Sequence, residues 1–342
     1  MRILVIKTSS LGDVIHALPA VSDAARAISG LVVDWAVERD FAAIPAWHPA
    51  VDQVIPVDLR AWRKRPLASL ARGELGALRA ALRRRRYDAV IDAQGLLKSA
   101  ALAALAGGAR HGLGFTSARE GIAAIAYRHR HYVAKGQHAI ARNRALFAAA
   151  LGYRVPGEEP DYGLSRDAMP ASGLASPYVV LLHGTTWATK QWPDARWRAL
   201  AGIARAQGYA VYAPAHGIME RARAEAIVAG LGQVLPEGDV AAAGAAIAGA
   251  AGVVAVDTGL AHLAAAFGVP TVTLYGATSP ALTGTLGRRQ LQRAASGMPC
   301  IPCRSRTCSV LGRAAPPPCL DAIAADDVWP LLAGLIARTG AS

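Results

Sequence analysis

The feature of this sequence that most constrains its fold is an alternation of short apolar runs with longer helical segments, which occurs twice along the chain. In the first half the β-rich runs are 2–7, 31–37, 53–58 and 89–94, and the helical patterns are 13–28, 67–86 and 95–106. In the second half the runs are 178–182, 210–214, 252–257 and 271–276, again with helical stretches between them. Strand, helix, strand repeated in this way predicts a parallel sheet covered by helices on both faces.

A stretch rich in glycine, proline and acids interrupts the alternation at 152–177 and is typical of an interdomain connector. The sequence therefore predicts two doubly wound, Rossmann-like α/β domains. We place them at 1–160 and 161–325, followed by a C-terminal helix, 326–342, that can pack back toward the first domain. Such sheets bind ligands outside the carboxyl ends of their strands, so two domains that face one another would share a cleft.

Length and composition fit a large folded protein. The 342 residues are enough for two ordinary domains, and 53% of them are apolar, which excludes global disorder. The longest weakly polar run, 241–256, is mostly Ala and Gly and is short of the roughly 20 apolar residues of a membrane span. The apolar run after Met1 and Arg2 is too short for a signal peptide, so we expect a cytoplasmic protein.

The chain carries a net charge of +13. A basic surface suits nucleic acid, anionic lipid or a phosphorylated substrate. The sequence has no zinc-finger motif, RNP-type aromatic motif or Lys-rich tail, and this disfavours nucleic acid as the partner.

The four cysteines stand in one stretch with the spacing C-x2-C-x4-C-x10-C, and they are Cys300, Cys303, Cys308 and Cys319. Four thiolates at such a spacing can hold zinc tetrahedrally, although the spacing does not match the usual pair of pairs. A disulfide is disfavoured in a cytosol. We favour a cysteine-bearing surface loop without metal and keep zinc as the weaker candidate.

Two nucleotide-binding signatures are missing from the sequence. No G-x-G-x-x-G follows a strand, which disfavours a dinucleotide-dependent dehydrogenase, and no G-x4-G-K-[ST] is present, which disfavours a P-loop kinase. The zinc-protease pattern H-E-x-x-H is absent too. The candidates that remain are three polar loops, each directly after a predicted strand.

The first loop reads "KTSSLGD" and ends on Asp13. Gly12 permits a tight turn, and the amides of the next helix can hold an anion or a reacting oxygen. Asp13 is either a cap of that helix or a catalytic carboxylate, and the spacing alone does not separate the two. His16, one turn further on, is expected to pack in the core.

The second loop, "HGTTWATKQWP" (183–193), offers the hydroxyls of Thr185 and Thr186 and the ammonium of Lys190. Hydroxyls, amides and one cation are what a diphosphate needs, whereas the alternative is an ordinary loop with a solvated lysine.

The third loop begins "DTGLAH" at Asp257. Thr258 and Gly259 fall where a helix would begin, so their amides can point at a ligand. We expect Asp257 to orient Lys190 or to accept a hydrogen bond from a sugar hydroxyl. His262 can cap or pack, which we favour over a ligand role.

Two phosphate-binding loops in the second domain and an acid in the first predict a division of labour, in which the second domain holds a nucleotide donor and the first activates an acceptor. This is the layout of a GT-B glycosyltransferase. The motifs that carry a closer resemblance are "KTSSLGDVIHALPA", "YDAVIDAQGLLKSA", "HGTTWATKQWP" and "DTGLAHLAAAFGVPTVTLYG". Together they resemble the ADP-heptose:lipopolysaccharide heptosyltransferases of glycosyltransferase family 9 over nearly the whole chain. "KTSSLGD" favours the type I enzymes, because the type II loop typically reads more like "PSWVGD".

The resemblance implies inverting transfer of L-glycero-D-manno-heptose from ADP-heptose to the first Kdo of Kdo2-lipid A, at the cytoplasmic face of the inner membrane. It implies that Asp13 is the general base and that Ser10 and Gly12 lie at the acceptor. It implies a diphosphate site, in which Lys190 also serves catalysis, made of Thr185, Thr186 and Lys190. It implies a donor pocket lined by Asp257, Thr258, Gly259 and His262. No cofactor is expected besides this donor substrate, and no divalent metal is demanded, since no acidic pair stands near the loops.

One stretch departs from the family pattern. The family usually has Gly-x-Glu after the strand at 210–214, and that Glu is thought to hold the ribose. This chain has "HGIME", so Met219 stands near that position and Glu220 beside it. We therefore assign Glu220 to the ribose only weakly.

Three rival functions remain. The nearest are heptosyltransferase II and another GT-B transferase that uses a nucleotide sugar. The third is a non-catalytic protein that binds an anionic sugar, but such a binder would place a donor or a cation at the position of Asp13.

A basic cluster follows the third predicted strand and consists of Arg60, Arg63 and Lys64, with Trp62 among them. At the carboxyl end of the first sheet, these side chains and Arg119 can meet the acceptor's carboxylates and phosphates. The same face would attract the enzyme to the anionic membrane surface. The run 83–86 ends a helix at the opposite edge and is expected to be solvated.

Overall fold

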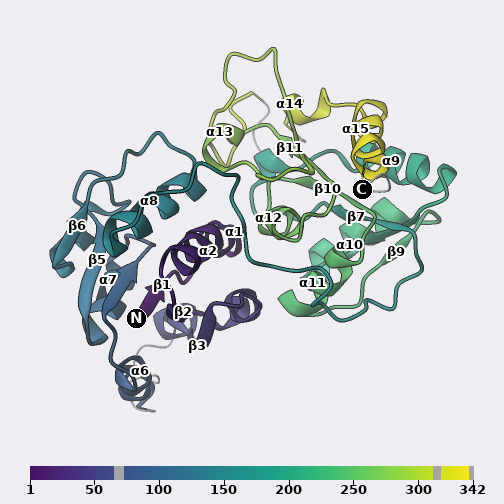
Figure 1. Cartoon of the computed structure of the whole chain (residues 1–342). Coiled ribbons are helices and arrows are strands. Elements are labelled where there is room, and N and C mark those ends of the chain that lie inside the picture. The colour runs from purple at the N-terminus through teal and green to yellow at the C-terminus, as the bar shows by residue number, and fades with distance from the viewer. Residues whose placement is uncertain (65–72, 311–316, 339–342) are drawn as a thin grey trace. The chain divides into compact units, whose positions relative to one another are not determined.

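The computed structural model describes residues 1–64, 73–310 and 317–338 and divides into two compact units, Met1–Leu164 and Ser165–Ser342. Each unit contains one six-stranded parallel sheet that is flanked by helices (Figure 1). The segment 152–177 follows a helix that ends at Leu151 and itself contains no helix or strand. The division between the two units falls within this segment.

The sheet of the first unit has the strand order β3-β2-β1-β4-β5-β6. Its strands are β1 Arg2–Ile6, β2 Val32–Glu38, β3 Val51–Val57, β4 Ala89–Asp92, β5 Ala109–Leu113 and β6 His129–His131. Its helices are α1 Leu11–Ile15, α2 Leu18–Ala27, η1 Arg39–Phe41, α3 Ala43–Ala46, α4 Leu59–Lys64, α6 Glu74–Arg83, α7 Leu97–Leu105, η2 Gly121–Ala126 and α8 Ala139–Leu151.

The sheet of the second unit has the strand order β12-β11-β10-β7-β8-β9. Its strands are β7 Tyr178–Leu182, β8 Ala210–Ala213, β9 Gln233–Val234, β10 Gly252–Val256, β11 Thr271–Tyr275 and β12 Gln290–Ala294. Its helices are η3 Ala188–Lys190, α9 Asp194–Ala206, α10 Gly217–Val228, α11 Val240–Ala248, α12 Gly259–Ala266, α13 Pro280–Thr283, α14 Pro318–Asp321 and α15 Ala325–Ala337.

Both sheets reverse their strand order at the same place. In the first unit the reversal lies between β1 and β4, and in the second unit it lies between β7 and β10. In doubly wound sheets a ligand binds outside the carboxyl ends of the strands at this switch point. The loops after these four strands are therefore where a site is expected.

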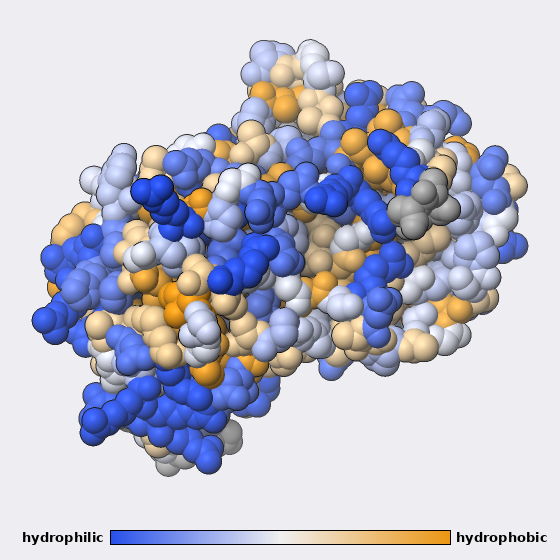
Figure 2. Space-filling model, in the orientation of Figure 1, coloured by the Kyte–Doolittle hydropathy of each residue, from blue (hydrophilic) through white to orange (hydrophobic). Residues whose placement is uncertain are grey.

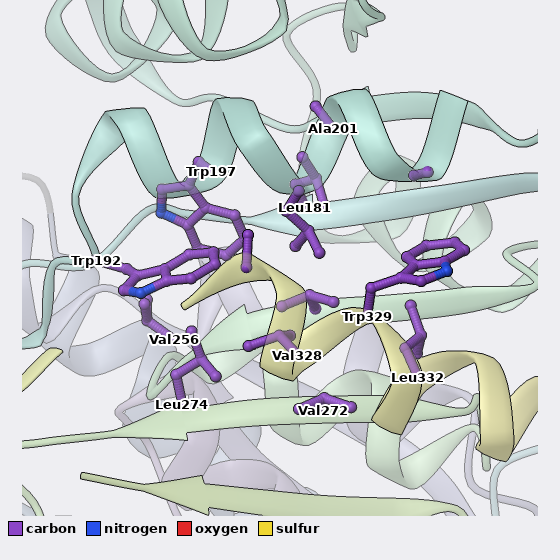
Figure 3. Packing of buried hydrophobic residues seen from close by; sticks show 14 of the residues in the cluster. Leu181, Trp192, Trp197, Ala201, Val256, Val272, Leu274, Val328, Trp329 and Leu332 are labelled. Atoms are coloured by element: carbon purple, nitrogen blue, oxygen red, sulfur yellow. The ribbon is translucent and has the colours of Figure 1, made fainter. Parts of the chain in front are cut away.

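The core of the second unit is built around three tryptophans (Figure 3). Trp192 and Trp197 meet edge to face with ring centroids 4.9 Å apart, and Trp192 Nε1 donates to the carbonyl of Ile323 at 3.0 Å. Trp329 brings α15 onto this core, where α15 packs against α9 and the strands β10 and β11. The expected packing of residues 326–342 toward the first domain stays a prediction.

The predicted central strands are present within about two residues of their expected bounds, but four strands and one 13-residue helix were missed. These are β5, β6, α8, β9 and β12. The missed strands are polar, half-exposed or only two or three residues long, so they lack the apolar run of a central strand. The helix predicted at 13–28 is two helices, since Pro19 stands at the start of α2.

In the basic run at the end of α6, Arg83, Arg84 and Arg86 are exposed as expected, whereas Arg85 is half-buried and forms ion pairs with Asp52 and Asp34. Figure 2 shows a strongly hydrophilic surface over α6. Residues 65–72 lie outside the described residues, and they include the first part, 67–72, of the helix predicted at 67–86. Among the residues that the structure describes, every helix is too short or too polar to span a bilayer.

Candidate functional site

The loop after β1 is held by a glutamine from the loop after β4. Gln94 Oε1 accepts hydrogen bonds from the amides of Thr8 and Ser9 at 2.8 and 3.2 Å, and Gln94 Nε2 donates to the Ser9 carbonyl. Gln94 is itself held by Asp92 Oδ1, which accepts from its amide at 2.8 Å. The two loops at the first switch point therefore form one hydrogen-bonded unit.

Asp13 lies at the third position of α1 and faces Ser10. Its Oδ2 accepts from the Ser10 amide at 3.0 Å and from Ser10 Oγ at 2.8 Å. Asp13 therefore helps to cap a helix, but not as the N-cap of a helix that begins after it: Ser10 is the N-cap of α1, and Asp13 completes a capping box from the third helical position. The two interpretations are compatible, because a carboxylate held by such bonds is also well oriented for chemistry.

The charge state of Asp13 is set by its neighbours. Burial works to raise the pKa of Asp13, but Lys7, the two Ser10 hydrogen bonds and Arg119 outweigh it and hold the pKa below its usual range. Lys7 is buried, and its Nζ donates to the Ala93 carbonyl at 2.8 Å. Asp13 is therefore ionised at neutral pH.

Of the other site residues predicted in the first unit, the structure describes the side chains of only some. Arg119 is exposed in the loop after β5, and its charge reaches Asp13. Gly12 is buried in α1, Ser10 is exposed, and His16 packs against the His138 ring as expected. The predicted acceptor contacts whose side chains lie outside the described part of the chain are Arg60, Arg63 and Lys64 of α4.

In the second unit, Lys190 and Asp257 form an ion pair with Nζ and Oδ2 2.7 Å apart. Lys190 ends η3, in the loop after β7, and Asp257 follows β10, so the pair lies at the second switch point. Thr278, after β11, donates its hydroxyl to Asp257 Oδ2 at 2.6 Å, and His262 Nε2 lies 3.9 Å from Asp257 Oδ1. The prediction that Asp257 orients Lys190 is confirmed.

These contacts also fix the charge of Asp257. Burial works to raise its pKa, but His262, Lys190 and Thr278 outweigh burial and hold the pKa well below its usual range. A carboxylate that stays ionised holds the ammonium of Lys190 in place.

Trp187 adds an aromatic face to the same loop. Lys190 Nζ lies 4.6 Å from the centre of the Trp187 ring, and the Arg306 guanidinium lies 5.1 Å from it. Thr189 Oγ1 donates to the Ser305 carbonyl at 2.6 Å, which ties this loop to the cysteine-bearing loop. The ring restrains the lysine laterally while Asp257 holds its ammonium.

Backbone amides and hydroxyls complete this edge of the sheet. Thr258 is the N-cap of α12 and Gly259 its first residue, so the unpaired amides of the first turn lie beside the Lys190–Asp257 pair. Thr185 is half-buried and Thr186 exposed in the loop after β7.

Glu220 is placed at the same edge by α10. It lies in the first turn of that helix, and a methyl group added to Gly184, just after β7, would collide with Glu220 Oε1. Burial raises the pKa of Glu220 above its ordinary value. Met219 is 83% exposed, so Glu220 rather than Met219 turns toward the loop after β7.

A cavity of about 280 Å³ opens between residues 171–174, the loops after β8 and β9 and helix α11. Its lining includes Pro214, Leu235, Glu237 and Ala242. Glu237 Oε1 accepts from the amide of Gly217 at 3.2 Å, which links the cavity wall to the start of α10.

The four cysteines are free thiols and line one small cavity of about 20 Å³. Within the described residues, no three histidine, cysteine or acidic side chains are arranged to hold a metal ion. Burial, with Cys300 and Cys303 nearby, raises the pKa of Cys319, which favours the thiol form there. The arrangement gives no support to the zinc hypothesis.

Sequence reasoning missed Gln94, Trp187, Thr278 and Arg306. Gln94 and Trp187 lie inside motifs that the sequence singles out. Their motifs were therefore recognised, but no function was predicted for these two residues. Thr278 and Arg306 lie in other loops, and only the tertiary fold brings them to Asp257 and Trp187.

Comparisons with known proteins converge on one family. The model of glycosyltransferase family 9 (heptosyltransferase) matches residues 75–313. Lipopolysaccharide heptosyltransferase 1 of Pseudomonas aeruginosa is 51% identical over 312 residues, which cover 90% of this chain and 88% of that protein. The protein of the same name from Escherichia coli K12 is 45% identical over 295 residues, which cover 85% and 92%.

Solved structures agree. The E. coli heptosyltransferase WaaC with ADP matches with a TM-score of 0.86 and 41% identity, over 98% of this chain and 100% of that one. The same enzyme with ADP-2-deoxy-2-fluoro heptose matches with a TM-score of 0.83 and 40% identity, over 98% and 99% of the two chains. E. coli ADP-heptose lps heptosyltransferase II shares the fold, with a TM-score of 0.78 at 22% identity over 99% and 100% of the two chains.

Proposed function

The chain belongs to glycosyltransferase family 9, the heptosyltransferases, and from this premise we propose that it transfers L-glycero-D-manno-heptose from ADP-heptose to the first Kdo of Kdo2-lipid A. The observation that carries the proposal is the match, over 98% of the chain, to a heptosyltransferase solved with ADP and with a fluorinated ADP-heptose. The fold is GT-B, and the enzyme is a glycosyltransferase of the type I group by identity to its curated relatives.

We propose that the second unit holds the donor. Lys190, the hydroxyls of Thr185 and Thr186, and the amides at Thr258 and Gly259 bind the diphosphate. The support is their common place at the second switch point, with a positive ammonium beside a helix N-terminus.

The nucleoside is assigned to the neighbouring cavity. Glu220 accepts the ribose hydroxyls, and the cavity beside the loop after β9 takes the adenine. The support is the position of Glu220 against Gly184 of the diphosphate loop, and the hydrogen bond that links Gly217, at the start of α10, to Glu237 of the cavity lining. Asp257 and His262 line the heptose side of the pocket, where Asp257 also keeps Lys190 oriented.

The first unit supplies the chemistry in this proposal. A sugar hydroxyl becomes a competent nucleophile when its proton is taken as the new bond forms, and an ionised, oriented Asp13 can take it. The acceptor oxygen attacks the anomeric carbon from the face opposite the leaving ADP, so the anomeric configuration inverts. Negative charge then grows on the diphosphate, and Lys190 with the loop amides stabilises it.

The acceptor is assigned to residues around Asp13. Ser10, Gly12 and Arg119 are near it, and Arg119 already acts on its charge. Arg60, Arg63 and Lys64 complete the anion-binding set in the proposal. With a lipid-linked acceptor, the enzyme works at the cytoplasmic face of the inner membrane as a peripheral protein, and nucleic acid is not among its partners.

The test is a transfer assay with ADP-heptose and Kdo2-lipid A, read by mass spectrometry. The expected product is the acceptor plus one heptose. A parallel reaction offers Kdo2-lipid A that already carries one heptose, which a type II enzyme would use. Product only in that parallel reaction would reassign the acceptor, and binding of ADP-heptose without any product would favour a non-catalytic protein.

A further inference from the structure

The first unit exposes a group of large apolar side chains around η2. Their exposed fractions are 53% for Leu97 and Phe115, 57% for Ile122, 64% for Ile125 and 78% for Tyr132. These five residues, called the η2 patch below, lie within residues 97–132, whereas the other large exposed apolar residues in the described part of the chain are single, apart from the adjacent Ile218 and Met219. Isolated exposed apolar residues are common, but a contiguous group marks an interaction surface.

Hydrogen bonds and a cation–π contact also join the segments that carry the η2 patch. Arg130 Nε donates to the Ala124 carbonyl of η2 at 2.8 Å, and the Arg130 guanidinium lies 5.4 Å from the centre of the Phe115 ring. The Leu97 amide donates to Glu120 Oε2 at 2.7 Å, which ties the start of α7 to the start of η2. Strands β5 and β6 pair beside them at the edge of the sheet, near α7 (Figure 1).

Helix η2 packs its small side chains inward and exposes its large apolar ones. Its sequence is "GIAAIA", and the small residues Ala123 and Ala124 are the buried ones, packed with Ala100 and Tyr127. The larger Ile122 and Ile125 face solvent. The fold thus uses alanines for packing and leaves the isoleucines without a role in the core.

The charges around the η2 patch are almost all positive. Residues 97–135 contain six lysines or arginines and one acid, Glu120. Glu120 already accepts the Leu97 amide, and Arg128 and Arg130 are exposed beside the isoleucines. A second copy of this surface would repel the first. An anionic surface would attract it.

We propose that the η2 patch docks the protein on an anionic lipid bilayer. Isoleucine and phenylalanine enter the boundary between headgroups and acyl chains, Tyr132 lies at headgroup level, and Arg128 and Arg130 pair with lipid phosphates. The biological reason rests on the proposed function, since a lipid-linked acceptor places the reaction at a membrane.

The η2 patch is connected to the reactive loop of the first unit. Lys98 follows Leu97 on α7, and its Nζ donates to Ser9 Oγ at 3.3 Å. Arg119 lies in the same loop as Phe115, and its charge acts on Asp13. Docking by the η2 patch would therefore bring the Asp13 loop toward the lipid surface that carries the acceptor.

The test is flotation of the full-length protein with vesicles of phosphatidylglycerol and phosphatidylethanolamine, against vesicles of phosphatidylcholine alone. Wild type should float with the anionic vesicles and much less with the neutral ones. The double variant Ile122→Ser with Ile125→Ser should partition at least 10-fold less. A matched control, Leu75→Ser with Val155→Ser, removes two exposed apolar side chains elsewhere and should behave as wild type.

Two further measurements distinguish a failure of the docking proposal from a failure of the proposed function. Transfer to a deacylated, soluble acceptor should be equal in the double variant and wild type, whereas transfer to acceptor in vesicles should fall. Equal flotation of the double variant and wild type would overturn the docking proposal, whatever the activity. A wild-type dimer in sedimentation that the double variant abolishes would instead assign the η2 patch to a second copy.

Discussion

At the scale of single residues, the observed capping role of Asp13 and its proposed role as general base are compatible in one side chain. Both Ser10 hydrogen bonds go to Oδ2, so Oδ1 is the atom that we expect to receive the acceptor proton. Lys7 and Arg119 keep the carboxylate ionised, and they do so without forming the hydrogen bonds that orient it. Ser10 thus orients the carboxylate and also lowers its pKa, whereas Lys7 and Arg119 act on its charge alone.

Asp13→Asn should lower kcat by about 10²- to 10⁴-fold, because the amide keeps the shape of the side chain but cannot take a proton. ADP affinity should stay near that of wild type, since the donor residues belong to the second unit. Kinetics with purified protein and titration with ADP check both. The control Ser10→Ala removes one orienting bond and should cost much less. Near-normal turnover of a folded Asp13→Asn protein would defeat the assignment.

Lys190→Ala should weaken both ADP-heptose binding and kcat, because the diphosphate is charged before the reaction and gains charge during it. It also leaves Asp257 without its partner at 2.7 Å, so the folded protein should lose some stability. Calorimetry with ADP separates binding from turnover. The control Lys135→Ala removes an exposed lysine of the first unit and should change neither. If ADP affinity and rate survive Lys190→Ala, the diphosphate is held by other groups.

At the scale of elements, the connector is anchored where it leaves the first unit. Gly163 has φ of +67°, and a methyl group there would collide with Nε2 of His48. That imidazole is buried, lies 2.9 Å from Ser22 Oγ and accepts the Ala50 amide on Nδ1. The end of the unit is therefore fixed by a packed histidine rather than by a strand or a helix.

Gly163→Ala should destabilise the first unit more than Gly30→Ala does. Both glycines have φ of +67° and belong to the first unit, but nothing lies within 4 Å of a methyl group at Gly30. The backbone strain should cost about 1–2 kcal/mol in each variant, and the collision should add about 1–3 kcal/mol at Gly163 alone. Urea unfolding measures both. Equal losses would show that His48 moves aside freely.

The accuracy of sequence reasoning also depends on the element. The strands next to each switch point are buried apolar runs, and β7 Tyr178–Leu182 has its expected bounds. The edge strand β6, "HRH", has no apolar residue, so only its pairing with β5 defines it. The same difference in predictability exists among the loops. The ion pair between Lys190 and Asp257 could be predicted, because the residue types of two loops suggest it. The bond of Thr278 to Asp257 depends on how a third loop returns, which no local pattern encodes.

At the scale of the whole molecule, several histidines make folding sensitive to acid. Burial lowers the pKa of His48, His111 and His183 from 6.5 to about 4, with Arg223 adding to the effect at His183. Between these two values the unfolded chain binds protons that the folded chain does not. The contribution of these histidines to the free energy of unfolding is therefore complete above pH 6.5, and it is lost as the pH drops toward 4.

Thermal melting between pH 7 and pH 4 should show this loss in both units, since His48 and His111 belong to the first and His183 to the second. For the well-buried His48 alone, the shift corresponds to about 3 kcal/mol. His48→Gln removes one titrating group and should flatten the dependence for the first unit. A melting temperature that is constant down to pH 4 would contradict the assigned direction.

The shared strand order of the two sheets has a consequence for how such a chain can change over generations. The same topological position holds Asp13 and Gln94 in one half and Lys190 and Asp257 in the other. What distinguishes the halves is the loop composition, because the scaffold beneath is the same. Under the division of labour that we propose, substitutions before the connector would alter which sugar is extended and would leave the nucleotide site after it unchanged. The repeated architecture makes the chain modular, so that new glycan linkages can arise by revising one half.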